Sequence, residues 1–245
     1  RIVVSLLEDS DPTLRAVREL FSDVAQDQAA LVFEVAGVSD PSLFSEITLN
    51  ASGTLTIHPA FNGNGSATIT VRAVDPSGAS AAVPIEVTLT PVNDAPVSKF
   101  GSLGVVQLQE DSGLNNLGFS DLDYNTGGGL FAESSQSLSY KITRVPDSTF
   151  GKIVLADGLT EVSQDQTLEL SQIRGLQFRT EPDAFGTAVF EFQVLDDGGT
   201  SDEGLNALVE RLDIVVSNVN DIPTFDAIGN VTVLRDSSDI LIDLF

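Results

Sequence analysis

The chain lacks cysteine, methionine and tryptophan, and it has only two tyrosines and one histidine among its 245 residues. The absence of cysteine excludes disulfides, zinc–thiolate sites and thiol catalysis. The scarcity of Trp and Tyr disfavours a sugar-binding face built on aromatic platforms. His58 stands at the end of a predicted strand, and any Ser-His-Asp triad or histidine metal site would depend on it alone. We therefore expect that the chain is not an enzyme.

Basic residues are also scarce, with 12 Lys and Arg against 36 Asp and Glu. The formal net charge of −24 and the pI near 4.1 argue against binding to nucleic acid or to anionic membrane surfaces. No apolar run approaches the ~18 residues of a membrane-spanning helix, so we expect no direct membrane insertion. Hydrophobic residues make up 42% of the chain, enough for a folded core. Because the sequence starts at Arg1 and has no Met, we expect it to be a piece of a longer protein.

Internal repeats are the main feature that is present. The segment Val92–Pro96 (Val-Asn-Asp-Ala-Pro) recurs as Val219–Pro223 (Val-Asn-Asp-Ile-Pro). The acidic opening at residues 7–10 recurs at 109–112 and, more weakly, at 234–237. The order of the motifs predicts a first unit at residues 1–96, a second at 97–223 and the truncated start of a third at 224–245. The second unit carries an insertion at residues 124–137, which is our first candidate for a specific contact surface.

Period-two alternation of apolar and polar residues predicts β-strands at residues 68–74, 85–89, 138–142 and 189–194. Dense Gly, Asn and Asp turn signals separate these segments. We therefore predict an all-β fold of tandem Greek-key β-sandwiches, cadherin-like or immunoglobulin-like, in an extended array. Residues 13–21 fit one face of a helix, although a distorted edge strand is the alternative. A helical turn is predicted around residues 171–173.

The repeated motifs resemble cadherin-like tandem repeats of large bacterial surface proteins. They are the Asn-Asp-x-Pro junctions, the Glu-Asp-Ser openings and the Ala-x-Asp turn at residues 73–75. The second unit is similar in particular to chondroitin sulfate proteoglycan-type repeats, through residues 138–153, 176–178 and 183–186. This resemblance covers nearly the whole chain. It implies a row of β-sandwiches that are often stiffened by calcium at their junctions.

Calcium prefers about six to eight oxygen ligands, mostly carboxylate and carbonyl, which a domain junction can gather from both units and the linker. At the first junction, matching cadherin positions are Glu8, Asn93, Asp94, Asp121 and Asp123, together with Asp196 or Asp197. The linker lacks an acidic residue at Pro91, and residues 59–62 lack the acidic cluster of cadherins. We therefore expect one or two ions here rather than three.

The second junction offers Glu110, Asn218, Asn220 and Asp221. The carboxylates of its third unit would lie beyond Phe245, so we expect this site to be empty or weakly filled. Asp75 would serve a junction that precedes Arg1, or it belongs to a plain β-turn. Turn chemistry alone is the alternative interpretation of the Asn-Asp-x-Pro motifs, because Asn and Asp side chains bond to nearby backbone and Pro fixes the exit of the turn.

The sequence thus predicts an extracellular or cell-surface module that acts as a calcium-stiffened spacer and takes part in adhesion. Its partners would be neighbouring repeats of the same chain, and other surface proteins or glycans. The alternative from another class is a carbohydrate-binding β-sandwich module of a secreted polysaccharide-processing protein.

Overall fold

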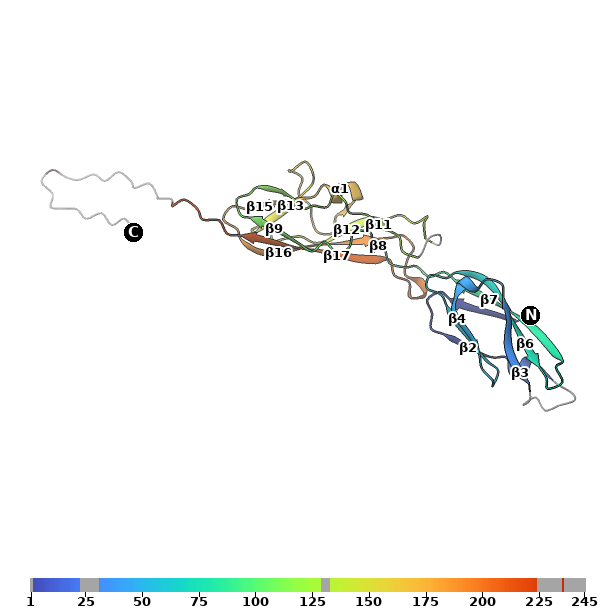
Figure 1. Cartoon of the computed structure of the whole chain (residues 1–245). Helices are drawn as coiled ribbons and strands as arrows, with labels where there is room; N and C mark the ends of the chain where they lie inside the picture. Colours follow the sequence, from blue (N-terminus) through green and yellow to red (C-terminus); the bar gives the residue numbers. More distant parts are fainter. Residues whose placement is uncertain (1, 23–30, 129–132, 224–234, 236–245) are drawn as a thin grey trace.

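The computed structural model describes residues 2–22, 31–128, 133–223 and 235. Figure 1 shows two groups of strands, one after the other along an elongated molecule, joined by a short connection. We refer to strands β1–β7 as the first sandwich and to strands β8–β17 as the second sandwich. The third unit predicted at residues 224–245 lies outside the described residues except for Arg235.

The first sandwich consists of two sheets. One sheet has the order β1-β7-β6-β3 and the other has the order β2-β5-β4. The bounds of these strands are β1 Ile2–Leu7, β2 Thr13–Ala16, β3 Val32–Val38, β4 Phe44–Leu49, β5 Thr54–Pro59, β6 Gly65–Val74 and β7 Ser80–Thr90. Short 3-10 helices occur at Arg18–Leu20 and Pro41–Leu43.

The second sandwich has a five-stranded sheet in the order β14-β12-β16-β17-β9 and a three-stranded sheet in the order β10-β15-β13. Residues 91–96, between β7 and β8, are the first linker, and residues 218–223, after β17, are the described part of the second linker. A two-stranded ribbon of β8 and β11 follows the first linker. The bounds are β8 Val97–Ser98, β9 Val105–Gln109, β10 Leu114–Asn116, β11 Tyr124–Asn125, β12 Ser139–Arg144, β13 Gly151–Val154, β14 Thr167–Leu168, β15 Gln177–Thr180, β16 Gly186–Leu195 and β17 Ala207–Ser217. Helix α1 spans Leu170–Arg174, and a 3-10 turn spans Ser201–Glu203.

Each sandwich has its own hydrophobic core. The first core draws its buried residues from between Val4 and Leu89, and the second from between Leu117 and Val216. Strands β6 and β16 show how the sequence builds these cores, because alternate residues along each strand are buried. The all-β sandwich class is therefore confirmed, and the alternating segments form β6, β7, β12 and β16 as predicted. The boundaries at residues 96 and 223 remain our proposed division of the chain.

The helix predicted for residues 13–21 was wrong, and the edge-strand alternative is confirmed for residues 13–16. Strand β2 pairs antiparallel with β5, with Leu14 opposite Thr56. Leu14 is exposed, whereas Val17 and Phe21 are buried in the first core. Val17 and Phe21, on either side of the 3-10 turn Arg18–Leu20, thus enter the core, whereas Leu14 on β2 does not, and the three residues do not share one helical face. The helical turn predicted at residues 171–173 is confirmed as α1.

The first and last strands of each sandwich are neighbours and run parallel. Strand β1 pairs with β7 so that Leu7 lies opposite Thr90, and β9 pairs with β17 so that Gln109 lies opposite Ser217. Because parallel strands end at the same edge, the acidic residue that follows the first strand lies beside the linker that follows the last strand. This topology places the candidate site.

Candidate functional site at the linkers

Glu8 is a buried carboxylate that directly follows β1 and lies beside the start of the first linker, with only 2% of its surface exposed. One carboxylate oxygen, Oε1, accepts a hydrogen bond from the backbone N–H of Val92 at 2.7 Å. The other, Oε2, accepts one from Nδ2 of Asn64 at 2.9 Å. Glu8 therefore ties the end of the first sandwich to the linker.

The partly buried Asp94 and the buried Glu133 bring two further carboxylates to the same linker. The backbone N–H of Asp94 donates to Oε1 of Glu133 at 2.9 Å. The remaining oxygens, Oδ2 of Asp94 and Oε2 of Glu133, are buried and accept no hydrogen bond within the described parts of the chain. Two carboxylates from different units thus meet with unsatisfied oxygens, an arrangement that is costly unless a cation or proton is added.

The pKa values of these two side chains reflect this environment. Burial is the main cause that raises the pKa of Asp94, and the negative charges of Asp9 and Glu8 raise it further. Burial also raises the pKa of Glu133, with additional contributions from Asp94, Asp196 and Glu8. Hydrogen bonding from backbone amides opposes the shift in both cases. The negative charges of Asp94, Asp196 and Glu8 therefore all act on Glu133.

Asp196 completes this group from the second sandwich, at the end of β16. Its Oδ1 accepts hydrogen bonds from the backbone N–H of Gly198 and from Nδ2 of Asn93, both at 2.9 Å. Its Oδ2 is buried and has no partner among the described residues. The neighbouring Asp197 is exposed, and its Oδ1 accepts a hydrogen bond from the backbone N–H of Ser137 at 2.9 Å. We call Glu8, Asp94, Glu133 and Asp196 the first-linker carboxylates.

The structure places the other two predicted ligands of this junction differently. The Asp123 carboxylate forms an ion pair with Lys99 at 2.9 Å, and Arg174 approaches its other oxygen at 3.8 Å. The hydrogen bond from Lys99 is the main cause that lowers the pKa of Asp123. Asp121 is exposed. In the described segments, no hydrogen bond or ion pair joins either residue to the first-linker carboxylates, and their role as ligands stays a prediction.

Sequence reasoning missed Glu133, which lies in the insertion at residues 124–137. Its neighbourhood depends on glycine, because a Cβ at Gly128 would overlap with the Glu133 carboxyl group. A Cβ at Gly127 would lie 2.6 Å from the carbonyl oxygen of Ala95 in the linker. The Gly-rich segment therefore lets the loop approach the linker closely. A single acidic residue within such a segment was the only signal available in the sequence.

A second acidic group lies at the other end of the second sandwich. Glu110 is 2% exposed, and its Oε1 accepts hydrogen bonds from the backbone N–H of Val219 at 2.6 Å and from Nδ2 of Asn218 at 2.7 Å. Its Oε2 is buried and lacks a partner within the described ranges. The predicted ligand Asn220 donates from Nδ2 to the carbonyl oxygen of Asp221 at 3.1 Å.

Beside Glu110, the carboxylates of Asp111, Asp183 and Asp221 approach within 4.8 Å of one another. Burial and the charges of Asp183, Asp111 and Glu110 raise the pKa of Asp221. This is the one group of three such ligands at that spacing found among the described residues. The sequence predicted Glu110 and Asp221 but missed Asp111 and Asp183, which come from the acidic opening and from the loop before β16.

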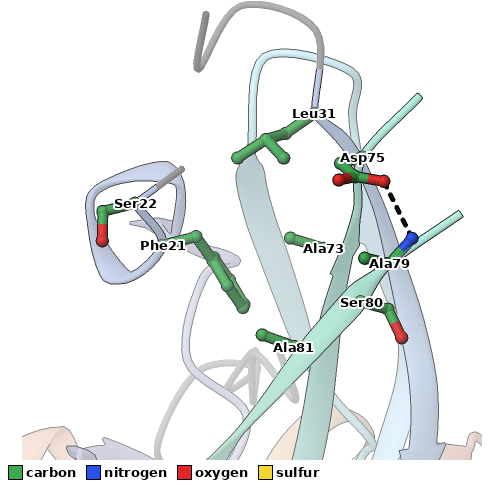
Figure 2. A pocket seen from close by; sticks show the side chains of 8 residues that line it. All are labelled: Phe21, Ser22, Leu31, Ala73, Asp75, Ala79, Ser80 and Ala81. Atoms are coloured by element: carbon green, nitrogen blue, oxygen red, sulfur yellow. Dashed lines mark hydrogen bonds between the residues drawn. The ribbon is translucent and has the colours of Figure 1, made fainter. Parts of the chain in front are cut away.

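Asp75 stands at the opposite pole of the first sandwich, beside a hollow of about 240 Å³ that Phe21, Leu31 and Ala81 also line (Figure 2). Its carboxylate accepts hydrogen bonds from Oγ of Ser77 and from the backbone N–H of Ala79, the latter at 2.8 Å. The hydrogen bond with Ser77 is the main cause that lowers the pKa of Asp75. Both oxygens are thus satisfied within one turn, which matches the β-turn interpretation of residues 75–78.

His58 lies on β5, and its Nε2 is 3.6 Å from a carboxylate oxygen of Glu46 on the paired strand β4. No helix in the described parts of the chain has the length and apolar character needed to cross a bilayer. The His58–Glu46 contact lies within the first sandwich and involves neither acidic group.

Comparison with solved structures found chains with distant likeness. Human CDH23 EC21-23 is 14% identical, with a TM-score of 0.41, 92% of this chain covered and 70% of that one. Drosophila N-cadherin EC1-4 is 15% identical with a TM-score of 0.39, and human Desmocollin-1 ectodomain is 10% identical with a TM-score of 0.36. This chain is covered to 88% and 90% in these two matches and spans 50% and 41% of the solved chains.

The comparison with curated proteins gave no match. A family model described as "Bacterial Ig domain" matches residues 2–88, a range that contains β1 and the other strands of the first sandwich and ends within β7. The first sandwich is therefore similar to bacterial immunoglobulin-like domains.

Proposed function

We propose that the chain is a structural spacer of an extracellular or cell-surface protein, and that calcium bound at its linkers stiffens the array of sandwiches. The observation that carries this proposal is the set of buried carboxylate oxygens of Asp94, Glu133 and Asp196 beside the first linker, which have no hydrogen-bond partner among the residues that the structure describes. Calcium accepts carboxylate oxygens in flexible geometry, and it removes the repulsion between them. The chemistry of these oxygens fits such an ion, whereas among the described residues the spacing of three carboxylates within 4.8 Å of one another is found at the second linker.

The ligand set comes from three parts of the chain. Glu8 belongs to the first sandwich, Asp94 to the linker, and Glu133 and Asp196 to the second sandwich. An ion held by all three would oppose bending at the linker and would stabilise the folded state, because it binds only when these parts are together. The second acidic group, around Glu110 and Asp221, is the corresponding candidate at the next linker.

Calcium-dependent thermal unfolding tests this function. We expect calcium to raise the melting temperature by several degrees relative to chelator, with a smaller effect of magnesium, which requires a more regular shell of ligands. Small-angle X-ray scattering of the same samples would show a narrower range of molecular lengths with calcium. No calcium-specific change in either measurement would overturn the stiffened-spacer mechanism.

Matched variants identify the ligands. Glu133→Gln and Asp94→Asn are expected to remove most of the calcium-dependent rise, because each replaces a buried charged oxygen donor. Asp121→Asn removes the same charge from an exposed side chain and serves as the control. If Asp121→Asn and Asp123→Asn abolish the calcium effect while Glu133→Gln retains it, the ligand set predicted from the sequence is correct and the one proposed from the geometry is wrong.

Adhesion through glycans is the second candidate function, in the form of a carbohydrate-binding module. Both tyrosines are buried, but Phe61 is 82% exposed beside a hollow of about 440 Å³ that Val97, Leu205 and Asp94 also line. An exposed aromatic side chain next to a polar group is a typical sugar platform. Retention on a panel of polysaccharides that is lost in Phe61→Ala would support this function, and no retention would exclude it for that panel.

A further inference from the structure

Asn93 is the most fully engaged side chain of the first linker. Its Nδ2 donates to Oδ1 of Asp196 at 2.9 Å and to the carbonyl oxygen of Leu205. Its Oδ1 accepts a hydrogen bond from Nε2 of Gln136 at 2.7 Å. Its backbone carbonyl accepts a hydrogen bond from the N–H of Leu205 at 2.7 Å. Every one of these partners belongs to the second sandwich.

Two glycines open the space that Asn93 occupies. A Cβ at Gly198 would overlap with Oδ1 of Asn93 and with Nε2 of Gln136. A Cβ at Gly204 would lie 3.2 Å from both Cβ and the backbone nitrogen of Asn93. Gly198 is not required by a positive φ, so its lack of a side chain serves the close approach of Asn93.

The first sandwich has a turn at the position that corresponds to residues 196–199 of the second sandwich, but a side chain of the turn itself fills the place of the Asn93 amide. Strands β6 and β16 both begin at a glycine with φ of 134° and end immediately before Asp75 and Asp196, respectively. Two positions later stand Ser77 in the first sandwich and Gly198 in the second. Oγ of Ser77 donates to the Asp75 carboxylate, as Nδ2 of Asn93 does to Asp196. A side chain of the turn therefore takes the place that the linker amide takes in the second sandwich.

We propose that the second sandwich has a binding site for the carboxamide of Asn93 at the end that faces the first linker. This site, which we call the cradle, is formed by Gln136, Asp196, Gly198, Gly204 and Leu205. Asn93 inserts into the cradle and acts as a latch. The latch holds the linker on the second sandwich through direct hydrogen bonds and needs no cation. It leaves Oδ2 of Asp196 free for the first-linker site, because Oδ1 alone receives the amide. The carboxamide is matched to the cradle because it offers donors to two acceptors and an acceptor to one donor.

The latch is tested on the full chain in chelator, where calcium makes no contribution. Asn93→Ala removes the inserted side chain, and Gly198→Ala fills the cradle. Both variants are expected to broaden the distribution of molecular lengths in small-angle scattering. Both are also expected to accelerate hydrogen exchange of the Leu205 amide by about tenfold or more, as expected for the loss of one or more buried hydrogen bonds.

Each variant has a matched control within the chain. Asn220→Ala removes the corresponding side chain of the second linker, whose amide contacts the carbonyl oxygen of Asp221. Gly37→Ala adds a methyl group at a position with open space around it. Both controls are expected to match the parent chain in scattering and in exchange at Leu205.

Two results would overturn the latch. Unchanged scattering and unchanged Leu205 exchange in Asn93→Ala would overturn the latch. A change confined to calcium affinity would also overturn it, and would identify Asn93 as the ligand that the sequence predicted. If Asn93→Ala fails to fold, Gln136→Ala removes only the bond to Oδ1 and provides the same readouts. Failure of the calcium experiments leaves these chelator measurements unaffected.

Discussion

Glu8 and Glu110 hold the same place in the two sandwiches. Each follows a first strand that pairs in parallel with the last strand, and each carboxylate accepts a hydrogen bond from the backbone N–H of a linker valine. Both glutamates are 2% exposed. The repeated motif of the sequence therefore corresponds to a repeated structural connection between the start and the end of each sandwich.

The two connections differ in the loop that faces them. In the first sandwich, the backbone N–H of Asn62 donates to Asp9 at 2.8 Å, and Asn64 donates to Glu8. In the second, the backbone N–H of Asp183 donates to Asp111 at 3.3 Å, and Phe185 replaces Asn64 in the loop before the strand. Amide groups thus satisfy both oxygens of Glu8, whereas one oxygen of Glu110, beside three carboxylates, has no hydrogen-bond partner within the described part of the chain.

Substitutions at the matching loop positions 62 and 183 are expected to change the calcium affinities of the two linkers in opposite directions. Asp183→Asn removes one carboxylate from the second acidic group and is expected to weaken calcium binding there by about tenfold, because affinity follows the number of charged ligands. Asn62→Asp adds a carboxylate beside Asp9 and is expected to strengthen binding at the first linker. Isothermal titration calorimetry of both variants against the parent chain measures these changes. Equal affinities in all three chains would contradict the assignment of these loops.

Much of the fold was predictable because it depends on local pattern. In strands β6 and β16 buried residues alternate with more accessible ones, and glycine-containing turns bound both strands, so their sequences carry the structural signal. The segment at residues 13–21 misled the prediction, because the spacing of Leu14, Val17 and Phe21 also suits a helix. Pairing of β2 with β5 decided its conformation, and this pairing is a tertiary contact.

The candidate site was predictable only where it follows the repeat. Glu8, Asp94 and Asp196 lie at repeated or matching positions, and the topology brings them to one linker. Glu133 comes from an insertion with no counterpart in the first unit, so no repeat signals it. Asp123 fits the motif, but Lys99 forms an ion pair with it, a contact that spacing along the chain does not reveal.

Gly151 provides a test of packing in the second core. It is buried at the start of β13, and a Cβ there would overlap with the Phe178 ring and lie 2.7 Å from the carbonyl oxygen of Arg179. Gly151→Ala is therefore expected to destabilise the second sandwich by about 1–3 kcal/mol, the usual cost of overpacking. Urea unfolding measures the change, with Gly37→Ala as the control in open space. An unchanged free energy of unfolding in Gly151→Ala would contradict this prediction, because it would mean that β13 and β15 move apart at no cost to accommodate the added methyl group.

Glu210 lies on the core-facing side of β17, in the same alternation as Leu212 and Ile214, and it is 5% exposed. Burial raises its pKa, while the hydroxyl groups of Tyr124 and Ser98 lower it in part. Burial and the charge of Glu210 in turn raise the pKa of Tyr124. The buried carboxylate thus lies beside the β8–β11 ribbon that receives the linker.

The direction of the pH effect follows from these shifts. A carboxyl group whose pKa is raised in the folded state binds its proton more tightly there than in the unfolded chain. Its contribution to stability is therefore greatest at low pH and is lost as the pH rises from the unfolded pKa through the folded one. Above that range the ionised, buried side chain has a constant cost.

Glu210→Gln removes this cost while it keeps the size and the hydrogen-bonding ability of the side chain. We expect the melting temperature of the variant to rise relative to the parent chain by a few degrees at pH 7, and the difference to shrink toward pH 4, where the parent carboxyl group is protonated. Thermal unfolding in chelator across this pH range measures the difference without interference from calcium. A difference that stays constant with pH would show that Glu210 has the same proton affinity in the folded and unfolded chains.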